Sequence, residues 1–205
     1  MKLQRTSPVA FAFVSAATLA LSAVAVLVPP AWAQTHQPAD KIQVSTSTIE
    51  VMDTTQPQPV TLLTATLRTS TPADLLIQVT GECALFTEVM SPDGHAKANV
   101  KFWVELDGMP VPVTSDPAKG GPDDGKVVFC NREFQITTAD LIDLFLKTRQ
   151  SHAFNWGTLN VGNGIHTIEV KAQLDVEAGG GTAEAAVGKR TLIVEPAHLT
   201  NDATI

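Results

Sequence analysis

The clearest pattern in the sequence is Gly162-Asn163-Gly164-Ile165-His166-Thr167-Ile168-Glu169-Val170-Lys171-Ala172-Gln173-Leu174-Asp175-Val176. From Ile168 onward every even-numbered residue is apolar and every odd-numbered residue is polar or charged. Side chains of a strand alternate between the two faces of its sheet, so this period of two indicates one buried and one wet face. The stretch predicts a long β-strand.

The segments on either side of this strand carry shorter patterns of the same kind, at 42–52, 60–68, 75–89, 98–107, 127–136, 152–161 and 185–195. Residues typical of turns, mainly glycine, proline, serine and aspartate, separate them. Eight or nine strands at this spacing predict an all-β sandwich. We expect a single domain at 42–196, a loose N-terminus at 34–41 and a tail at 197–205.

Two strand segments contain an irregularity. The apolar positions of 42–52 change parity between Val44 and the pair Ile49 and Val51, which indicates either a bulge or a step from one sheet to the other. Gly81 interrupts the segment 75–89, and a glycine inside a strand usually marks a bulge.

One segment has the pattern of a helix. Thr137 and Asp140 have the spacing of a capping pair. The residues that follow on one helical stripe are Leu141, Leu144, Phe145 and Thr148. We therefore expect one short helix at 139–147, with a strand at 141–146 as the alternative.

Residues 1–33 have the features of a secretory signal peptide. Lys2 and Arg5 give a basic start, 9–28 is mostly apolar, and Ala31-Trp32-Ala33 is a small-x-small cleavage site. The apolar run is long enough to span a bilayer, so an uncleaved anchor is the alternative, although Pro29-Pro30 favours cleavage. We expect export to the periplasm or the medium, with no stable membrane anchor after cleavage.

The charge of the chain argues against nucleic acid as a partner. Removing residues 1–33 takes away Lys2 and Arg5, so the formal charge changes from −7 to −9. Binding to phosphates needs a basic face, and no polybasic membrane patch is present in the sequence.

Cys83 and Cys130 are the only two cysteines of the chain. A pair of cysteines in an exported protein is most often a disulfide, and the alternative is two buried free thiols. The sequence therefore predicts a Cys83–Cys130 bridge.

The motif Gly162-x-Gly164-x-His166-x-Ile168 resembles the start of the penultimate strand in immunoglobulin-like and fibronectin-III-like domains. In those domains a tyrosine at the place of His166 ties the corner to the backbone. The resemblance implies an immunoglobulin-like sandwich and a structural, hydrogen-bonded role for His166. It departs from the antibody pattern because Ile168 replaces the second cysteine, so Cys83 and Cys130 would form a different cross-link.

No motif in the sequence indicates a metal, a cofactor or a catalytic residue. The five histidines form no His-x-His or His-x-x-x-His pair, and the sequence has no nucleophile elbow and no phosphate-binding glycine loop. Asp116, Asp123 and Asp124 offer carboxylates to a hard cation such as calcium, but their spacing favours a solvated acidic loop at 115–126.

A binding surface is the better functional candidate. By parity Trp103 shares the wet face of its strand with Lys101 and Glu105, and Trp156 lies near an expected turn. Exposed tryptophans combine a large apolar area with a hydrogen-bond donor and often mark contacts with sugars or proteins. The alternative for Trp103 is a place under a loop or under the helix.

These observations favour a non-catalytic exported β-sandwich that binds another protein or an envelope component, such as a glycan. The alternative is a carbohydrate-binding module that uses Trp103 or Trp156. An envelope hydrolase is a remote third hypothesis, because paired carboxylates can be joined by folding alone.

Overall fold

The computed structural model describes residues 39–52, 59–90, 94–113, 123–136 and 143–199. These residues all belong to one compact unit of the chain, 36–205. The predicted signal peptide at 1–33 therefore lies outside the described residues. Within the part that the structure describes, no helix could cross a membrane.

The described residues form β-strands and no helix. In chain order the strands are β1 (Gln43–Ser47), β2 (Glu50–Met52), β3 (Val60–Thr69), β4 (Ala73–Met90), β5 (His95–Leu106), β6 (Met109–Pro110), β7 (Val127–Gln135), β8 (Asp143–Val161), β9 (Gly164–Gly179) and β10 (Gly181–Ala197).

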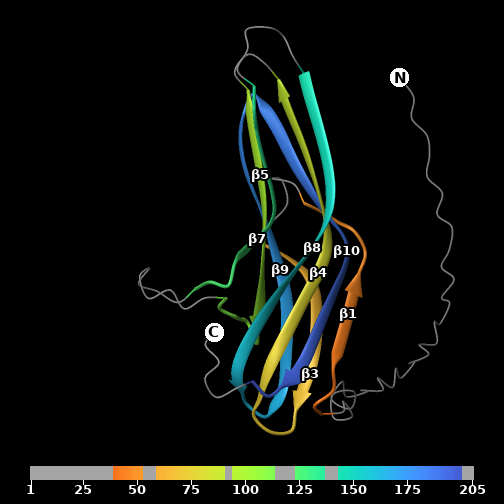
Figure 1. The fold of residues 1–205 in the computed structure, drawn as a ribbon, viewed down its shortest axis with the longest axis vertical. Helices are drawn as coiled ribbons and strands as arrows, with labels where there is room; N and C mark the ends of the chain where they lie inside the picture. The colour runs from red at the N-terminus through yellow and green to blue at the C-terminus, as the bar shows by residue number, and fades with distance from the viewer. Residues whose placement is uncertain (1–38, 53–58, 91–93, 114–122, 137–142, 200–205) are drawn as a thin grey trace, which may run out of the picture. The chain divides into compact units, whose positions relative to one another are not determined.

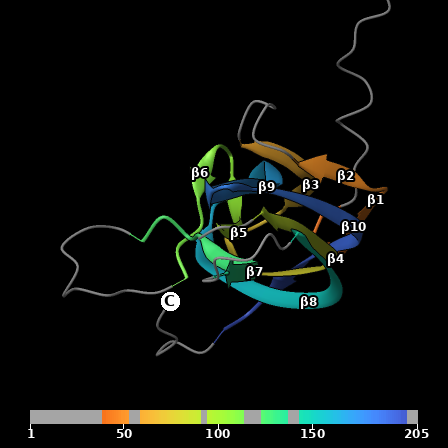
Figure 2. The same ribbon diagram turned by 90° about the horizontal axis from the view of Figure 1, so that it is seen from above.

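The strands form two antiparallel sheets (Figure 1). Sheet A has the order β1-β10-β4-β8, and the short β2 also pairs with β10. Sheet B has the order β3-β9-β5, and both β6 and β7 pair with β5. Buried residues of both sheets form one core, so the architecture is a β-sandwich, as the sequence predicts. The view from above in Figure 2 shows the edge strand β7 of sheet B beside β8 of sheet A.

The strand order is that of a jelly roll. Without the short β2 and β6, the remaining strands pair from the ends of the chain towards its middle, as β1 with β10, β3 with β9, β4 with β8 and β5 with β7. The pairing of β10 with β4 and of β9 with β5 then joins these four pairs into two sheets. Eight antiparallel strands wound in this way define the jelly-roll arrangement.

This order differs from the immunoglobulin-like type that the motif at Gly162–Ile168 implied. In immunoglobulin-like domains the penultimate and last strands share a sheet. Here β9 belongs to sheet B and β10 to sheet A. The structure thus supports the coarser class, an all-β sandwich, and the short resemblance does not extend to the sheet topology.

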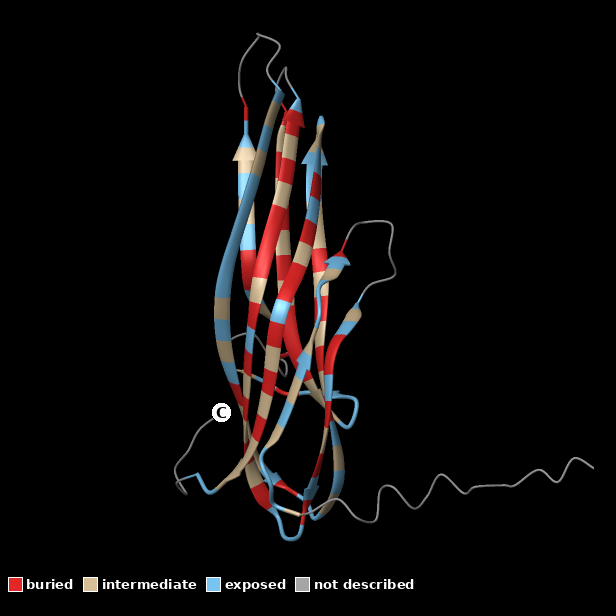
Figure 3. Ribbon diagram, turned by 90° about the vertical axis from the view of Figure 1, so that its right-hand side faces the viewer, coloured by how far each residue is buried: buried red, intermediate tan, exposed pale blue. Residues whose placement is uncertain are grey.

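The strand with the clearest alternation, β9, lies in the middle of sheet B between β3 and β5. Ile168, Val170 and Ala172 are fully buried, whereas Glu169 and Lys171 between them are partly exposed. Figure 3 shows this alternation of buried and more exposed residues along the strands of the sandwich. Burying an isoleucine or valine side chain contributes about 2 kcal/mol, so the even positions of β9 stabilise the sandwich.

The main core lies between the inner faces of the two sheets. Its largest fully buried side chains include Trp156, Phe102, Met52, Leu67, Leu75 and Ile77. A second, smaller cluster of Val89, Ala96 and Ile136 lies where β4, β5 and β7 approach the β4–β5 connection.

The predicted helix at 139–147 is wrong over the residues that the structure describes. Asp143 to Lys147 begin β8, where Asp143 pairs with Met90 and Lys147 with Phe86 of β4. Residues 139–142 lie outside the described residues. A short apolar run fits both periods, and pairing with a long neighbouring strand decides between them. The strand alternative is therefore confirmed from residue 143 onward.

The parity change in 42–52 is not a step between sheets, because β1 and β2 both pair with β10 of sheet A in one continuous register. It coincides with an irregularity of β10, whose register with β4 shifts between Val187 and Arg190. The buried Arg190 fills this break: its Nε donates to the Leu62 carbonyl (3.1 Å) and its Nη2 donates to Ser47 Oγ (3.1 Å). Nη1 of Arg190 donates to the carbonyl of Val187 (3.1 Å). The guanidinium thus replaces missing ladder bonds, a role that the sequence did not suggest.

Gly81 has no bulge of its own, since β4 pairs with β8 in continuous register around it. The extra residues lie opposite, in β10. A side chain at Gly81 would start 3.4 Å from Cβ of Arg190 and 3.7 Å from the Phe129 ring. The glycine therefore leaves room for the buried arginine and the core aromatic ring.

Candidate binding face

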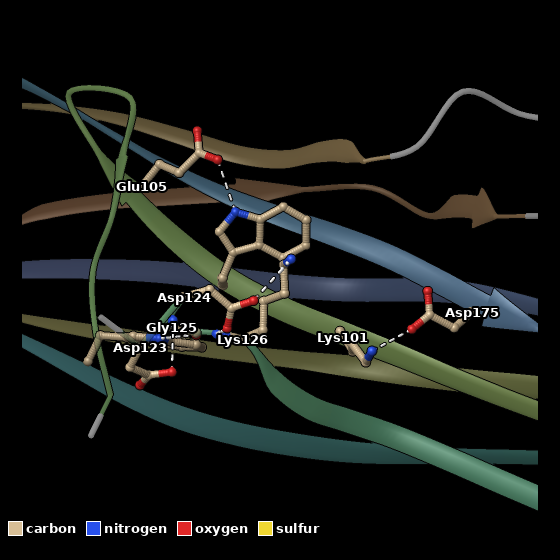
Figure 4. Close-up of polar contacts among 9 residues, drawn as sticks. Lys101, Glu105, Asp123, Asp124, Gly125, Lys126 and Asp175 are labelled. Carbon is tan, nitrogen blue, oxygen red and sulfur yellow. Dashed lines mark hydrogen bonds and ion pairs between the residues drawn. The ribbon is translucent and has the colours of Figure 1, made fainter. Parts of the chain in front are cut away.

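Trp103 is buried, and the prediction that it is exposed is wrong. Only 4% of the residue is accessible. The parity was correct, because its neighbours Phe102 and Val104 face the core, but other side chains cover the indole on the outer side. Its Nε1 donates to Glu105 Oε1 (2.9 Å), and Nζ of Lys126 lies 5.1 Å from the ring centroid (Figure 4).

Trp156 is also buried, with 1% of the residue accessible, so it offers no surface to a ligand. It belongs to sheet A, where its Nε1 donates to the Gly125 carbonyl (3.0 Å) and its ring meets that of Phe154 edge-on at 4.8 Å. The structure does not combine Trp103 and Trp156 in one surface. Both indoles instead contact neighbouring residues of the segment 123–126 and fix it.

The described carboxylates of the acidic loop are engaged by protein donors. Asp123 accepts from the backbone N–H groups of Val113 (2.7 Å) and Gly125 (3.3 Å). Asp124 accepts from the backbone of Lys126 and forms an ion pair with its Nζ (3.1 Å). Asp116 lies outside the described residues, and within the described ranges no three donors are placed to hold a metal ion.

Lys101 and Glu105 form ion pairs on the outer face of sheet B. Lys101 contacts Asp175 (2.6 Å), and Lys171 contacts Glu169 (3.1 Å) and Glu105 (3.8 Å). Lys97 lies between two further acidic residues, Glu133 (3.8 Å) and Glu177 (4.0 Å). The predicted binding surface is therefore a face whose charges are paired within the sheet.

His166 lies at the corner before β9 and contacts the backbone there. Its Nε2 donates to the carbonyl of Gly162 (2.9 Å), which also accepts from the buried Thr69 hydroxyl (2.6 Å). Its Nδ1 lies 2.7 Å from Asp107 Oδ2. Both ring nitrogens of His166 therefore have a hydrogen-bond partner at this corner.

Asp107 completes this corner from the β5–β6 hairpin. Asp107 and Gly108 have φ values of 52° and 81°, as a two-residue type I′ turn requires. Oδ1 of Asp107 accepts from the backbone N–H of Thr167 (2.8 Å). Partial burial raises the pKa of Asp107, but the hydrogen bonds from His166 and Thr167 outweigh it, so the pKa lies below its ordinary value of 3.8.

Cys83 and Cys130 lie at disulfide distance, as predicted, with Cα atoms 6.5 Å apart. They link β4 of sheet A to β7 of sheet B. Arg132 strengthens the same junction, because its Nη1 donates to the Leu146 carbonyl of β8 (2.9 Å). This edge of the sandwich is thus held by a covalent bond and a side-chain bridge.

The outer face of sheet A has a different character, and we call its part across β2, β10, β4 and β8 the sheet A face. Its outward-pointing apolar residues are Ile49, Val51, Ala84, Phe86, Met90, Phe145 and Ala186. Ile49, Val51 and Phe145 are 61%, 50% and 59% exposed. Contiguous exposed apolar surface on a folded domain marks a contact site more often than isolated apolar residues do.

A shallow hollow of about 150 Å³ lies in this face. Small residues form its floor: Ala84, Ala186 and Gly188, where a Cβ on Gly188 would lie 2.8 Å from Glu82 Oε2. The larger side chains that line it are Ile49, Phe86, Glu82, Lys147 and Arg149. The sheet A face therefore contains a recess lined by both apolar and charged side chains.

The charged residues around the hollow are only partly paired. Arg149 donates to Glu82, and this hydrogen bond lowers the pKa of Glu82 below its ordinary value. Nζ of Lys147 lies 4.7 Å from the Phe86 ring centroid. Glu184 is exposed. The change of parity at Ile49 and Val51 marked this segment in the sequence but did not indicate that both side chains are exposed, and the expected helix obscured Phe145.

No protein-family model matches the chain, and a search of curated proteins gives no match. Among solved structures the chain is similar to one in "Structure of infectious bursal disease virus Gx strain", with 15% identity and a TM-score of 0.31. The match covers 80% of this chain and 38% of that one, so this chain spans less than half the length of its structural neighbour.

Proposed function

We propose that this protein is an exported, non-catalytic β-sandwich that binds another protein through the sheet A face. The observation that carries the proposal is the exposed apolar surface across four strands, which includes Ile49, Val51 and Phe145 and contains a recess. Apolar area of this kind gains free energy when a complementary surface excludes water from it.

A protein suits this face better than a polysaccharide does. Sugar platforms use exposed aromatic rings, and the two tryptophans considered for that role, Trp103 and Trp156, are buried. The aromatic residues of the sheet A face, Phe86 and Phe145, carry no hydrogen-bond donor for sugar hydroxyls. The carbohydrate-binding alternative therefore loses the residues on which it depended.

The cysteine pair is consistent with export, because a disulfide persists in an oxidising compartment such as the periplasm or the exterior. The secretory features of residues 1–33 point to the same destination. The most conspicuous histidine, His166, has a structural use for both ring nitrogens, which favours a non-catalytic role.

The test is site-specific photo-crosslinking in the cells that make the protein. A photo-reactive residue in place of Val51 should form a covalent adduct with a protein, whereas one in place of Val128 should not. Val128 is the matched control, because it is an equally exposed valine on a strand of the other sheet. Adducts at both positions, or only at Val128, would contradict the proposal.

A further inference from the structure

We propose that the protein that covers the sheet A face is a second copy of this chain. The inference rests on the proposed function and names its partner. The two copies form a symmetric dimer. Its two-fold axis runs parallel to β4, lies in the plane between the two copies and passes over Phe86.

The key observation is one row of side chains across three strands. Phe86 of β4 is directly opposite Glu184 of β10 on one side and Lys147 of β8 on the other. All three lie outside the core, and both charged residues are exposed. Within the described residues the Glu184 carboxylate has no ion pair or hydrogen bond, and Nζ of Lys147 lies 4.7 Å from the Phe86 ring centroid. Across the three strands the row therefore consists of an acidic residue, an aromatic ring and a basic residue.

A two-fold rotation about an axis parallel to β4 brings this row opposite the same row of the second copy, in reverse order. It places β8 of one copy over β10 of the other, so that each Lys147 faces Glu184 of the second copy. It also places the two Phe86 rings against each other at the axis. An axis across the strands would instead put Lys147 against Lys147 and Glu184 against Glu184, so the charge pattern selects the axis along β4.

The neighbouring row permits close approach of the two copies. Ala84 of β4 is opposite Ala186 of β10, and Arg149 of β8 completes the row. Two alanines next to Gly188 leave the recess of about 150 Å³, into which long side chains of the second copy can extend. Arg149 is bonded to Glu82, so this row brings no unpaired charge to the interface.

The axis along β4 sets the area that the two copies can bury. Because β8 is the edge strand of sheet A, only β10, β4 and β8 of one copy lie over strands of the other. Three strands over about nine residues give a footprint of about 430 Å² per copy, or about 860 Å² in total. An area of this size is typical of a weak, transient interface, so we expect a dimer that dissociates on dilution.

The same axis brings one repulsive contact. Glu88, two residues from Phe86 along β4, lies close to the axis and therefore close to Glu88 of the second copy. Thr182 donates a hydrogen bond to it (3.3 Å), but no cation is recorded beside it among the described residues. The geometry thus predicts that Glu88→Gln strengthens the dimer several-fold.

Sedimentation of the mature protein over a concentration series tests the proposal. Lys147→Glu and Glu184→Lys should each weaken the dimer at least tenfold, because each places like charges opposite one another. The double variant should restore the wild-type association. The matched control is the pair Lys97→Glu and Glu177→Lys on the outer face of sheet B, which should leave the dissociation constant of the dimer unchanged. Thermal melting of each variant verifies that it is folded.

The outcomes separate this inference from the proposed function. A wild-type protein that stays monomeric while Val51 still crosslinks to a different protein would overturn the dimer and leave the proposed function intact. A monomer with no adduct at Val51 would overturn both. A dimer that neither single variant weakens, or that the double variant fails to restore, would overturn the arrangement along β4.

Discussion

The outer faces of the two sheets differ in how their charges and apolar residues are satisfied. On sheet B, Lys97 and Lys101 contact acidic residues of neighbouring strands, and the one large aromatic residue, Trp103, is covered. On sheet A, Ile49 and Phe145 are more than half exposed. The side chains of sheet B are satisfied within the sheet, whereas those of sheet A leave apolar area exposed, which is why we propose the sheet A face as the contact face. The comparison shows that the presence of a tryptophan alone does not indicate an exposed surface.

The largest effect should come from removing the link that holds the two sheets together. Replacing Cys83 and Cys130 by serine opens a loop of 47 residues, which in the chain-entropy model costs about 4 kcal/mol of unfolding free energy. Chemical denaturation of the double variant measures it. A loss of unfolding free energy below 1 kcal/mol would show that the two sheets are held together without the bridge.

Trp103→Ala should lower the stability of the fold without changing association through the sheet A face. The indole is buried against Glu105 and Lys126, so its loss should lower the unfolding free energy by about 3 kcal/mol. Association through the sheet A face should not change at a temperature where the variant is folded. Ile49→Glu is the reverse case, with little effect on stability and a large effect on association. An equal loss of association in both variants would contradict the contrast.

The corner at Asp107 should make the fold sensitive to acid. Because the pKa of Asp107 is lower in the folded protein, its ionised form contributes stability that is present above the ordinary pKa of 3.8 and is lost as the pH falls through and below that value. Asp107→Asn should cost about 1 kcal/mol at neutral pH and reduce the acid dependence. Melting curves between pH 7 and pH 3 test this, and an unchanged pH profile in the variant would be inconsistent with it.

The smallest effect should come from the paired charges of sheet B. Lys97 forms two partly exposed ion pairs, at 3.8 and 4.0 Å, so Lys97→Ala should change the unfolding free energy by at most about 0.5 kcal/mol. Denaturation at low and high salt measures this change. A loss above 1 kcal/mol would mean that the ion pairs contribute more to stability than their exposure indicates.

The sequence was most informative where a pattern is local. The alternation of Ile168 and Val170 predicts β9, and the two cysteines predict their own contact. The pairing of β1 with β10 joins the ends of the domain, and no local pattern specifies such a partner. The short motif at His166 therefore suggested an immunoglobulin-like order that the sheets do not have.

The candidate face was harder to predict because parity does not report exposure. Trp103 has the outward parity that its strand predicts, yet Lys126 from a distant segment lies over it. Phe145 lies in a run that fits both a helix and a strand, and only its pairing with Glu88 of β4 shows which side it faces. Exposure depends on neighbours that are far away in the sequence.

Covalent footprinting of both outer faces tests the central claim most directly. The mature protein is labelled at low concentration and again under conditions where it is associated, and the modification of each residue is compared. We predict that labelling of Ile49, Val51 and Phe145 falls several-fold on association, while labelling of Val128 on sheet B stays constant. Constant labelling of the sheet A face, or protection of Val128 instead, would contradict the account.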